Sequence, residues 1–223
     1  MKQTVWLIIL LAMGQVLSGQ QSDTRLWTSV AIRYDLNKKW RFSFEEEARF
    51  HENISQLDRL NSEFTVNYKI NKIFDGGLLY RLIAENNINR AMNLNHRFGA
   101  YLNADKKFAG WDCYLKATFQ KTYPGFFRQE DWFIPENYVR AEGGVSRELK
   151  NKKTEPYTNL EFWYLIAPEY QAFIDQYRFT IGFKQKLNKA NRLDFYFRIQ
   201  HEIQVADPLT AFIFGVGYQF KVR

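Results

Sequence analysis

The residues that could do covalent or acid–base chemistry are few in this sequence, and they form no motif. Nucleophilic hydrolysis needs a serine or cysteine beside a base, which is usually histidine. The three histidines, His51, His96 and His201, stand in no such arrangement. His51 and Glu52 could ligate a metal, but a metal site needs further ligands at a defined spacing. We therefore expect neither a catalytic site nor a bound cofactor or metal.

Charged residues recur instead at alternate positions of several segments. Glu45 and Glu47 could serve acid–base catalysis, but so many arginines share their side of the chain that we expect structural ion pairs. Burying an unpaired charge costs free energy. If these residues line the interior of one folded domain, we expect acids and cations to pair across that interior and to leave at most a narrow path for water. The predicted network comprises Arg41, Glu45, Glu47, Arg49, Glu63, Arg81, Glu85, Arg97, Arg140, Glu142, Glu161, Arg178, Arg198 and Glu202.

The elements that must position these side chains are β strands, because apolar and polar residues alternate along the chain. In the segment 60–70, Phe64 and Val66 fall on one parity, and Thr65 and Asn67 fall on the other. Successive side chains of a strand point to opposite faces, so this pattern makes one apolar wall and one polar wall. The pattern predicts strands near 26–36, 40–51, 60–70, 74–86, 92–105, 108–122, 137–150, 157–166, 172–187, 191–205 and 210–222.

The connections between the predicted strands indicate an antiparallel up-and-down barrel. Short, mostly lysine-bearing turns alternate with looser connections, of which 123–136 is the longest. Outer-membrane barrels of bacteria have short periplasmic turns, longer external loops and an even number of strands. We therefore expect about 12 strands, with 10 as the alternative. The eleven segments predicted above conflict with an even number, so either one strand is missed or merged with a neighbour, or residues 20–25 form an irregular leading piece.

Two arguments predict that the apolar wall faces outward, as in a transmembrane barrel. The apolar parity is crowded with bulky side chains such as Phe195, Phe197, Phe212 and Phe214, which a barrel of this size would have to pack inside at high density. The segments also reach the roughly 9–11 residues that a tilted membrane strand needs. The alternative is a soluble, lipocalin-like barrel with the apolar wall inside.

The N-terminus has the features of an export signal. An apolar run follows Lys2, and Ser18 and Gly19 offer small residues for cleavage. We expect residues 1–19 to be a signal peptide and residues 20–223 to form the barrel.

Cys113 is the single cysteine, so no internal disulfide can form. The net charge of +7 is dispersed along the chain, and nucleic-acid binding, which needs a clustered basic patch, is not expected.

Two features stand out against this pattern. Glu46 lies on the apolar parity, where an acid facing lipid is unfavourable. We expect either a β-bulge that turns it inward, which is the favoured explanation, or a partner surface. The segment 123–136 carries four large aromatics that could anchor a partner, or could lie in the barrel mouth or in the lipid interface. They are Phe126, Phe127, Trp132 and Phe133.

Several stretches resemble a family of exported barrel proteins of unknown function, the domain-of-unknown-function 2490 family common in Bacteroidota-type Gram-negative bacteria. The resemblance covers essentially the whole mature chain. It implies an outer-membrane β-barrel and brings no established activity or catalytic residues. The stretches are 36–50 (LNKKWRFSFEEEARF), 57–59 (LDR), 95–98 (NHRF), 134–140 (IPENYVR), 177–182 (YRFTIG) and 215–220 (GVGYQF).

These observations lead to one expected role and two alternatives. We expect a non-enzymatic outer-membrane barrel that serves as a structural, narrow-pore or partner-docking protein. Its partners would be membrane lipid, the barrel-insertion machinery and, at the external loops, a possible protein. The alternatives are a lipid-modifying enzyme with a site at the rim, and a soluble periplasmic barrel that binds lipid.

Overall fold

The structure is a β-barrel whose wall is a single sheet. The computed structural model describes residues 21–86, 92–124, 136–150, 153–166, 173–205 and 207–222. Among these residues, no helix is long and apolar enough to cross a membrane. The strands are β1 (Gln21–Asp35), β2 (Trp40–His51), β3 (Gln56–Lys69), β4 (Phe74–Asn86), β5 (Met92–Phe108), β6 (Trp111–Pro124), β7 (Glu136–Ser146), β8 (Thr154–Ile166), β9 (Phe173–Lys186), β10 (Asn191–Glu202) and β11 (Leu209–Val222).

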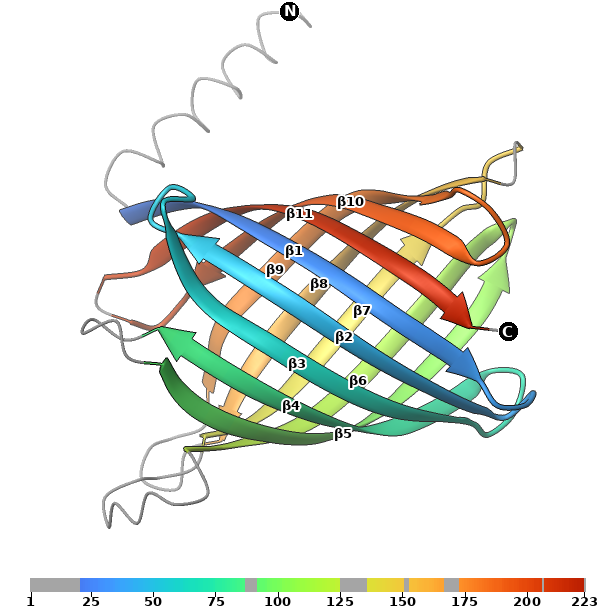
Figure 1. Ribbon diagram of the computed structural model, residues 1–223, viewed down its shortest axis with the longest axis horizontal. Coiled ribbons are helices and arrows are strands. Elements are labelled where there is room, and N and C mark those ends of the chain that lie inside the picture. The colour runs from blue at the N-terminus through green and yellow to red at the C-terminus, as the bar shows by residue number, and fades with distance from the viewer. Residues whose placement is uncertain are drawn as a thin grey trace, which may run out of the picture.

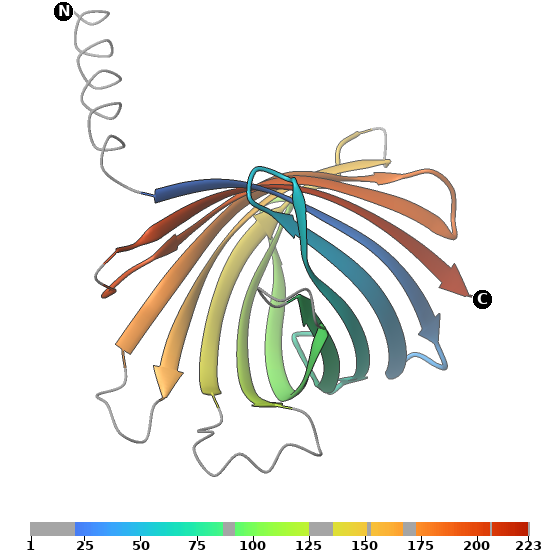
Figure 2. The same ribbon diagram turned by 60° about the vertical axis from the view of Figure 1, so that its left-hand side comes forward.

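Each strand pairs with its neighbours in sequence, and the sheet closes on itself between the first and last strands. All consecutive pairs, from β1–β2 to β10–β11, are antiparallel. Figures 1 and 2 show the strands inclined in the same sense around the barrel. The prediction of an all-β, up-and-down barrel is therefore confirmed for the eleven strands of the described residues.

The predicted strand number was wrong. The wall has eleven strands, and β1 pairs with β11 in parallel from Gln21↔Leu209 to Tyr34↔Val222. Both strands run toward the same end of the barrel (Figure 1). Direction alternates along an up-and-down sheet, so an odd number of strands must close through a parallel pair. No strand had been merged with another, and the piece expected to be irregular belongs to β1 from Gln21 onward.

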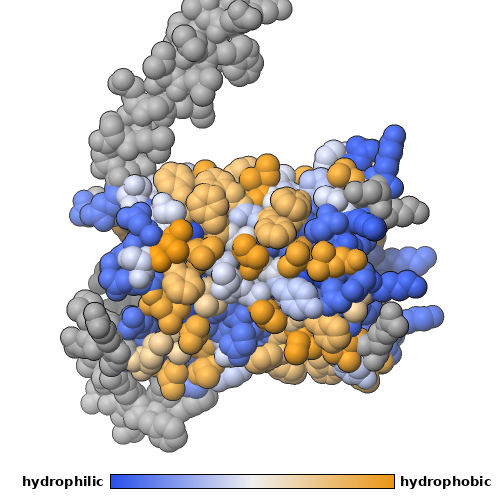
Figure 3. All heavy atoms as spheres, turned by 45° about the horizontal axis from the view of Figure 1, so that its top comes forward, coloured by the Kyte–Doolittle hydropathy of each residue, from blue (hydrophilic) through white to orange (hydrophobic). Residues whose placement is uncertain are grey.

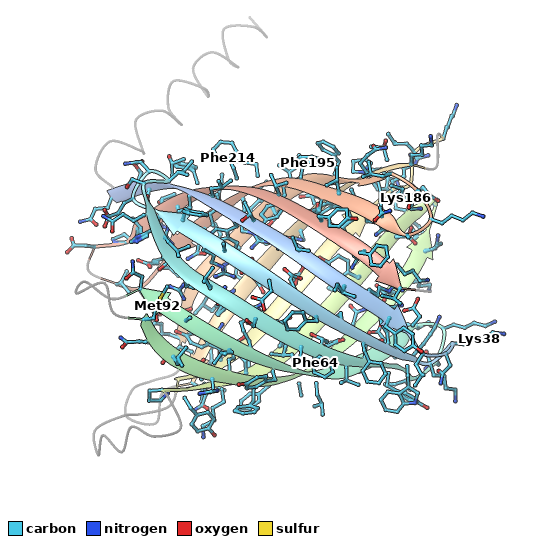
Figure 4. All side chains as sticks on the ribbon, in the orientation of Figure 1. Lys38, Phe64, Met92, Lys186, Phe195 and Phe214 are labelled. Atoms are coloured by element: carbon cyan, nitrogen blue, oxygen red, sulfur yellow. The ribbon has the colours of Figure 1, made fainter. Side chains whose placement is uncertain are left out.

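Side chains of the apolar parity lie on the outside, as the sequence predicts. Leu78, Leu115 and Ile181 are 65%, 70% and 54% exposed, whereas the inward Asn61 and Gln120 are almost completely buried. In Figure 4 the labelled Phe64, Phe195 and Phe214 project away from the barrel. Figure 3 shows the result on one face, where apolar residues are frequent in the middle and hydrophilic residues gather at the ends.

The interior is packed partly by tyrosine rings that lie across glycines of the adjoining strand. In each case the two residues are direct cross-strand partners, and a Cβ built on the glycine would collide with the ring. The alternation of the sequence does not by itself predict a role for these tyrosines. A glycine in a strand commonly marks such a close approach. The four pairs are Tyr101 on Gly77, Tyr114 on Gly144, Tyr157 on Gly182 and Tyr196 on Gly215.

The parallel seam between β1 and β11 carries a small apolar cluster on its inner side. Trp27, Ala211 and Ile213 are each at most 3% exposed, and Tyr196 packs against them. A parallel ladder is slightly less stable per residue than an antiparallel one. Burial of this cluster adds stability where the barrel closes.

The outward position of Glu46 is real, and the β-bulge expected to turn it inward is absent. The pairing Val30↔Glu46↔Ser62 is continuous, and the irregularity between β2 and β3 falls at Arg49 and Phe50. The exposed carboxylate of Glu46 accepts a hydrogen bond of 2.9 Å from the Ser62 hydroxyl. An acid and a serine therefore lie together on an otherwise apolar outer wall.

Candidate functional site: the charged lumen

The lumen contains a cavity of about 620 Å³ with a polar lining. Ten cationic and six acidic side chains line it, an excess of four positive charges. The cations are Arg33, Arg49, Arg81, Arg97, Lys116, Arg140, Arg178, Lys184, Arg192 and Arg198, and the acids are Glu45, Glu47, Glu63, Glu142, Glu161 and Asp194.

The strand register arranges many of these side chains in two rows across the wall. One row consists of the cross-strand partners Glu45, Glu63, Arg81 and Arg97, from β2 to β5. The second row runs over β6 to β9 and contains Lys116, Glu142, Glu161 and Arg178. Each row places acids beside acids as well as beside cations, so some side chains pair with their direct cross-strand partner and others must reach a residue outside their row.

Ion pairs connect much of the predicted network. Arg49 Nε lies 2.7 Å from Glu47 Oε1, and Arg81 Nη2 lies 2.7 Å from Glu63 Oε2. Glu161 is shared, because its two oxygens lie 3.4 Å from Arg140 Nη1 and 3.3 Å from Arg178 Nη1. Most of these side chains are largely buried, so each pair neutralises charge where hydration is reduced.

Other members of the predicted set make different contacts. Arg97 and Arg198 donate through Nε to the hydroxyls of Thr122 and Thr180, each at 2.9 Å. Glu142 accepts a hydrogen bond from the Tyr114 hydroxyl. Glu45 lines the cavity beside Glu63, and no described cation lies within 4 Å of its carboxylate.

Three predicted members lie at the ends of the barrel and do not line the cavity. Glu85 pairs with Arg59, at 2.8 Å between Oε1 and Nη2. Glu202 accepts the backbone N–H of Leu209 at 3.1 Å. Arg41 reaches Asp35 at the mouth formed by the short turns.

Asp35, which was not among the predicted site residues, contacts three cations at that mouth. It is the last residue of β1, and its carboxylate lies 3.0 Å from Arg33 Nε, 3.0 Å from Arg41 Nε and 2.7 Å from Lys221 Nζ. Partial burial by itself raises the pKa of the Asp35 carboxyl group, but the hydrogen bonds and charges of these cations outweigh it and hold that pKa well below its usual range.

Two tryptophans on the polar wall organise the arginines, and the sequence analysis missed both. The Cζ atoms of Arg49, Arg198 and Arg178 lie 3.7, 5.2 and 5.7 Å from the centre of the Trp27 ring. Arg178 and Arg140 lie 4.2 and 4.9 Å from the Trp163 ring. Guanidinium groups are attracted to the faces of aromatic rings, so the rings partly replace carboxylates. The signal in the sequence was a large aromatic on the inward parity.

Two of the three histidines make contacts typical of structure. The Tyr80 hydroxyl lies 2.8 Å from His96 Nδ1, and the Thr210 hydroxyl lies 2.8 Å from His201 Nδ1. Thr210 is only 5% exposed, so its hydroxyl is shielded from a substrate. Among the residues that the structure describes, no three His, Cys, Asp or Glu side chains come together as a metal site would require.

The possible partner loop, Phe126, Phe127, Trp132 and Phe133, lies outside the described residues. Residues 1–19, the expected signal peptide, also lie outside them.

Comparison with known proteins places the chain in a family. No curated protein matches it. A family model described as "Protein of unknown function (DUF2490)" matches residues 24–208. This span runs from β1 to the connection that precedes β11, and so covers most of the barrel wall. The chain therefore belongs to the DUF2490 family of proteins of unknown function.

Proposed function

We propose that this protein is an outer-membrane β-barrel without enzymatic chemistry, whose charged lumen gives it a structural or narrow-pore role. The observation that carries the proposal is the reversed distribution of side chains. Large apolar residues are exposed on the outer wall, and the inner wall holds the ion-pair network. A barrel in water has the opposite preference, because exposed apolar surface is unfavourable there.

The outer wall fits the dimensions and chemistry of a bilayer. The strands have 11 to 17 residues, and a tilted membrane strand needs about 9–11. Exposed aromatics cluster at the end of the barrel that carries the short turns, where an interfacial girdle is expected. They include Tyr34, Trp40, Phe74, Phe108 and Trp111.

The end of the barrel that carries the short turns is hydrophilic, as expected where a barrel leaves the membrane. Lys38 and Lys186 lie at the same end of the barrel, that of the short turns (Figure 4). By analogy with other outer-membrane barrels, this end faces the periplasm and the opposite end of the barrel faces outward. The last strand alternates Phe214, Val216, Tyr218 and Phe220, a pattern that the barrel-insertion machinery could read.

The lumen supports the non-enzymatic reading over the two alternatives. A lipid-binding barrel needs an apolar interior, and the cavity of this barrel is lined mainly by charged and hydroxyl side chains. A lipid-modifying enzyme that acts through a covalent intermediate needs an accessible nucleophile beside a base. Among the described residues, the hydroxyl in contact with His201 is that of Thr210, which is only 5% exposed, and the hydroxyl in contact with His96 is the phenol of Tyr80.

Membrane fractionation tests the proposal. The mature protein should remain with outer membranes after washing with high salt and with alkaline carbonate, and should require detergent for release. Recovery in the carbonate supernatant, or monodisperse protein without detergent, would overturn the proposal and favour the soluble alternative.

A further inference from the structure

The arginines in the middle of the lumen outnumber the carboxylates that contact them. We name Arg49, Arg97, Arg140, Arg178 and Arg198 the arginine cluster. All five line the same cavity. Arg49, Arg178 and Arg198 share the Trp27 ring, and Arg140 and Arg178 share the Trp163 ring.

Only two carboxylates of described residues lie within ion-pair distance of the arginine cluster. Glu47 pairs with Arg49, and Glu161 is shared by Arg140 and Arg178. Within ion-pair distance, the cluster therefore has three more cationic than acidic side chains, and the cavity as a whole has four more. Because these side chains are packed together in the confined lumen, this surplus produces a positive potential in the cavity.

Arg97 is the member that is least neutralised. Its cross-strand partner is another arginine, Arg81, which is already paired with Glu63. The other charges that act most strongly on it are those of Arg49, Arg140 and Arg59, all positive. Its contact within the described residues is a hydrogen bond from Nε to the neutral hydroxyl of Thr122, which leaves both Nη groups without a described carboxylate.

Arg140 adds a second unfilled donor. Its Nε is buried and has no hydrogen-bond partner among the described residues. A buried donor without an acceptor is costly, and it gains free energy from any acceptor that can reach it.

We propose that the arginine cluster is a binding site for a small oxyanion that carries at least two negative charges, with phosphate or sulfate as the simplest members of the class. Guanidinium groups bind phosphate-type and carboxylate oxygens through paired N–H donors. The cavity of about 620 Å³ is within the range of small-molecule sites. The site is inside the barrel wall, so the proposal does not depend on where the barrel resides.

Binding of inorganic phosphate and sulfate to the purified full-length mature chain tests the proposal. Calorimetry would measure stoichiometry, and tryptophan fluorescence would report on Trp27 and Trp163 within the site. Both anions should bind saturably, with about one per chain, in a background of chloride held at constant ionic strength. Because charge-assisted hydrogen bonds are the strong ones, Arg97→Gln should weaken the affinity at least tenfold.

Arg192→Gln is the matched control. Arg192 lines the same cavity, but it lies six residues before Arg198 on β10, which is about 20 Å along the strand. Its removal takes away the same charge and should change the affinity less than threefold, since the interaction at that distance is largely screened. Arg198→Gln is a second test variant should Arg97→Gln fail to give the β-sheet circular dichroism of the wild type.

Three results would overturn the proposal. One is that phosphate and sulfate bind no better than chloride at equal ionic strength. Another is an equal loss of affinity in Arg192→Gln and in the cluster variants, which would indicate a diffuse field and no site. The third is that folded Arg97→Gln and Arg198→Gln both keep the wild-type affinity. These measurements do not depend on the membrane location of the protein. If fractionation showed that the protein is soluble, they would still test the anion site.

Discussion

The ring of Tyr196 on β10 lies across the backbone of Gly215, its direct partner on β11. A Cβ at position 215 would overlap three atoms of that ring. Tyr196 also packs against Trp27, Ala211 and Ile213, so this contact belongs to the apolar cluster beside the parallel seam. The glycine is therefore required by the tyrosine ring.

Gly215→Val should destabilise the barrel by about 1–3 kcal/mol, the usual cost of forcing extra atoms into a packed site. Urea unfolding in detergent or lipid would measure it. Gly217→Ala is the control, because a Cβ there would meet only Ser29 Oγ at 3.2 Å and Asp194 Cβ at 3.5 Å. The double variant Tyr196→Ala, Gly215→Val should lose less than the sum of its single changes. Full additivity would contradict the assigned contact.

A charge on the outer wall should be unfavourable in proportion to its depth. Ile181 is 54% exposed and lies in the middle of β9. Ile181→Arg should lower the free energy of unfolding in lipid by about 2–4 kcal/mol, as at the middle of a bilayer. Ile73→Arg is the control, because Ile73 is exposed in the turn before β4. This substitution should lower the free energy of unfolding by less than about 1 kcal/mol. Equal, small effects would mean that water surrounds the wall.

Glu46 offers the reverse test of the same wall. Glu46→Leu removes an outward acid between Val30 and Ser62, and should stabilise the barrel in lipid by about 1–2 kcal/mol, since acids cost less than bases there. Glu46→Gln keeps the shape and removes the charge, so it should give part of that gain. Both free energies come from unfolding measurements in vesicles. A loss of stability in both variants would indicate that Glu46 has a stabilising partner on the outer wall.

The strands were predictable from the sequence because side-chain alternation is a local property. Phe64, Val66 and Tyr68 indicate the outer face of β3 with no knowledge of its neighbours. How the sheet closes into a barrel is a non-local property. The strand number was therefore predicted from the general rule that outer-membrane barrels have an even number of strands. The parallel pairing of β1 with β11 became visible only when all the strands were placed together.

The candidate site was predictable in composition but not in connectivity. Parity identifies Arg81 and Arg97 as inward, but only the register shows that they are cross-strand partners. That Arg97 has no carboxylate partner among the described residues follows from this arrangement. Trp27 and Trp163 were not predicted as members of the site because large aromatics were assigned to the outer wall, although both stand on the inward parity of their strands.

Stability near the turn mouth should depend on pH through Asp35. Arg33, Arg41 and Lys221 hold the pKa of its carboxyl group below the usual range in the folded state. Such a group stabilises the fold above its ordinary pKa, near 4, and loses this contribution as the pH falls toward its folded value. Asp35→Asn should therefore lower the urea midpoint at pH 7, and the difference from wild type should shrink steadily below about pH 4.

Asp112→Asn is the control for Asp35. Its partner Lys107 is 81% exposed in its side chain, at 3.2 Å between Nζ and Oδ1, and pairs so open to water contribute little. Its urea midpoint should stay close to that of wild type at pH 7. If the urea midpoints of Asp35→Asn and wild type differ by the same amount from pH 7 to pH 3, the ion pairs of Asp35 are not the cause of that difference.

Conductance across a planar bilayer should be far below that of a large porin. Porins of 16–18 strands enclose an open aqueous channel, whereas the lumen of this eleven-stranded barrel is occupied by the stacked Trp27 and Arg49 and by the shared pairs of Glu161. Trp27→Ala removes the ring that three arginines surround and should increase the conductance severalfold. Ser29→Ala, which alters one small lining residue on the same strand, should leave it unchanged. A porin-like conductance of the wild type, or no increase in Trp27→Ala, would show that the tryptophan and arginine side chains do not obstruct the lumen.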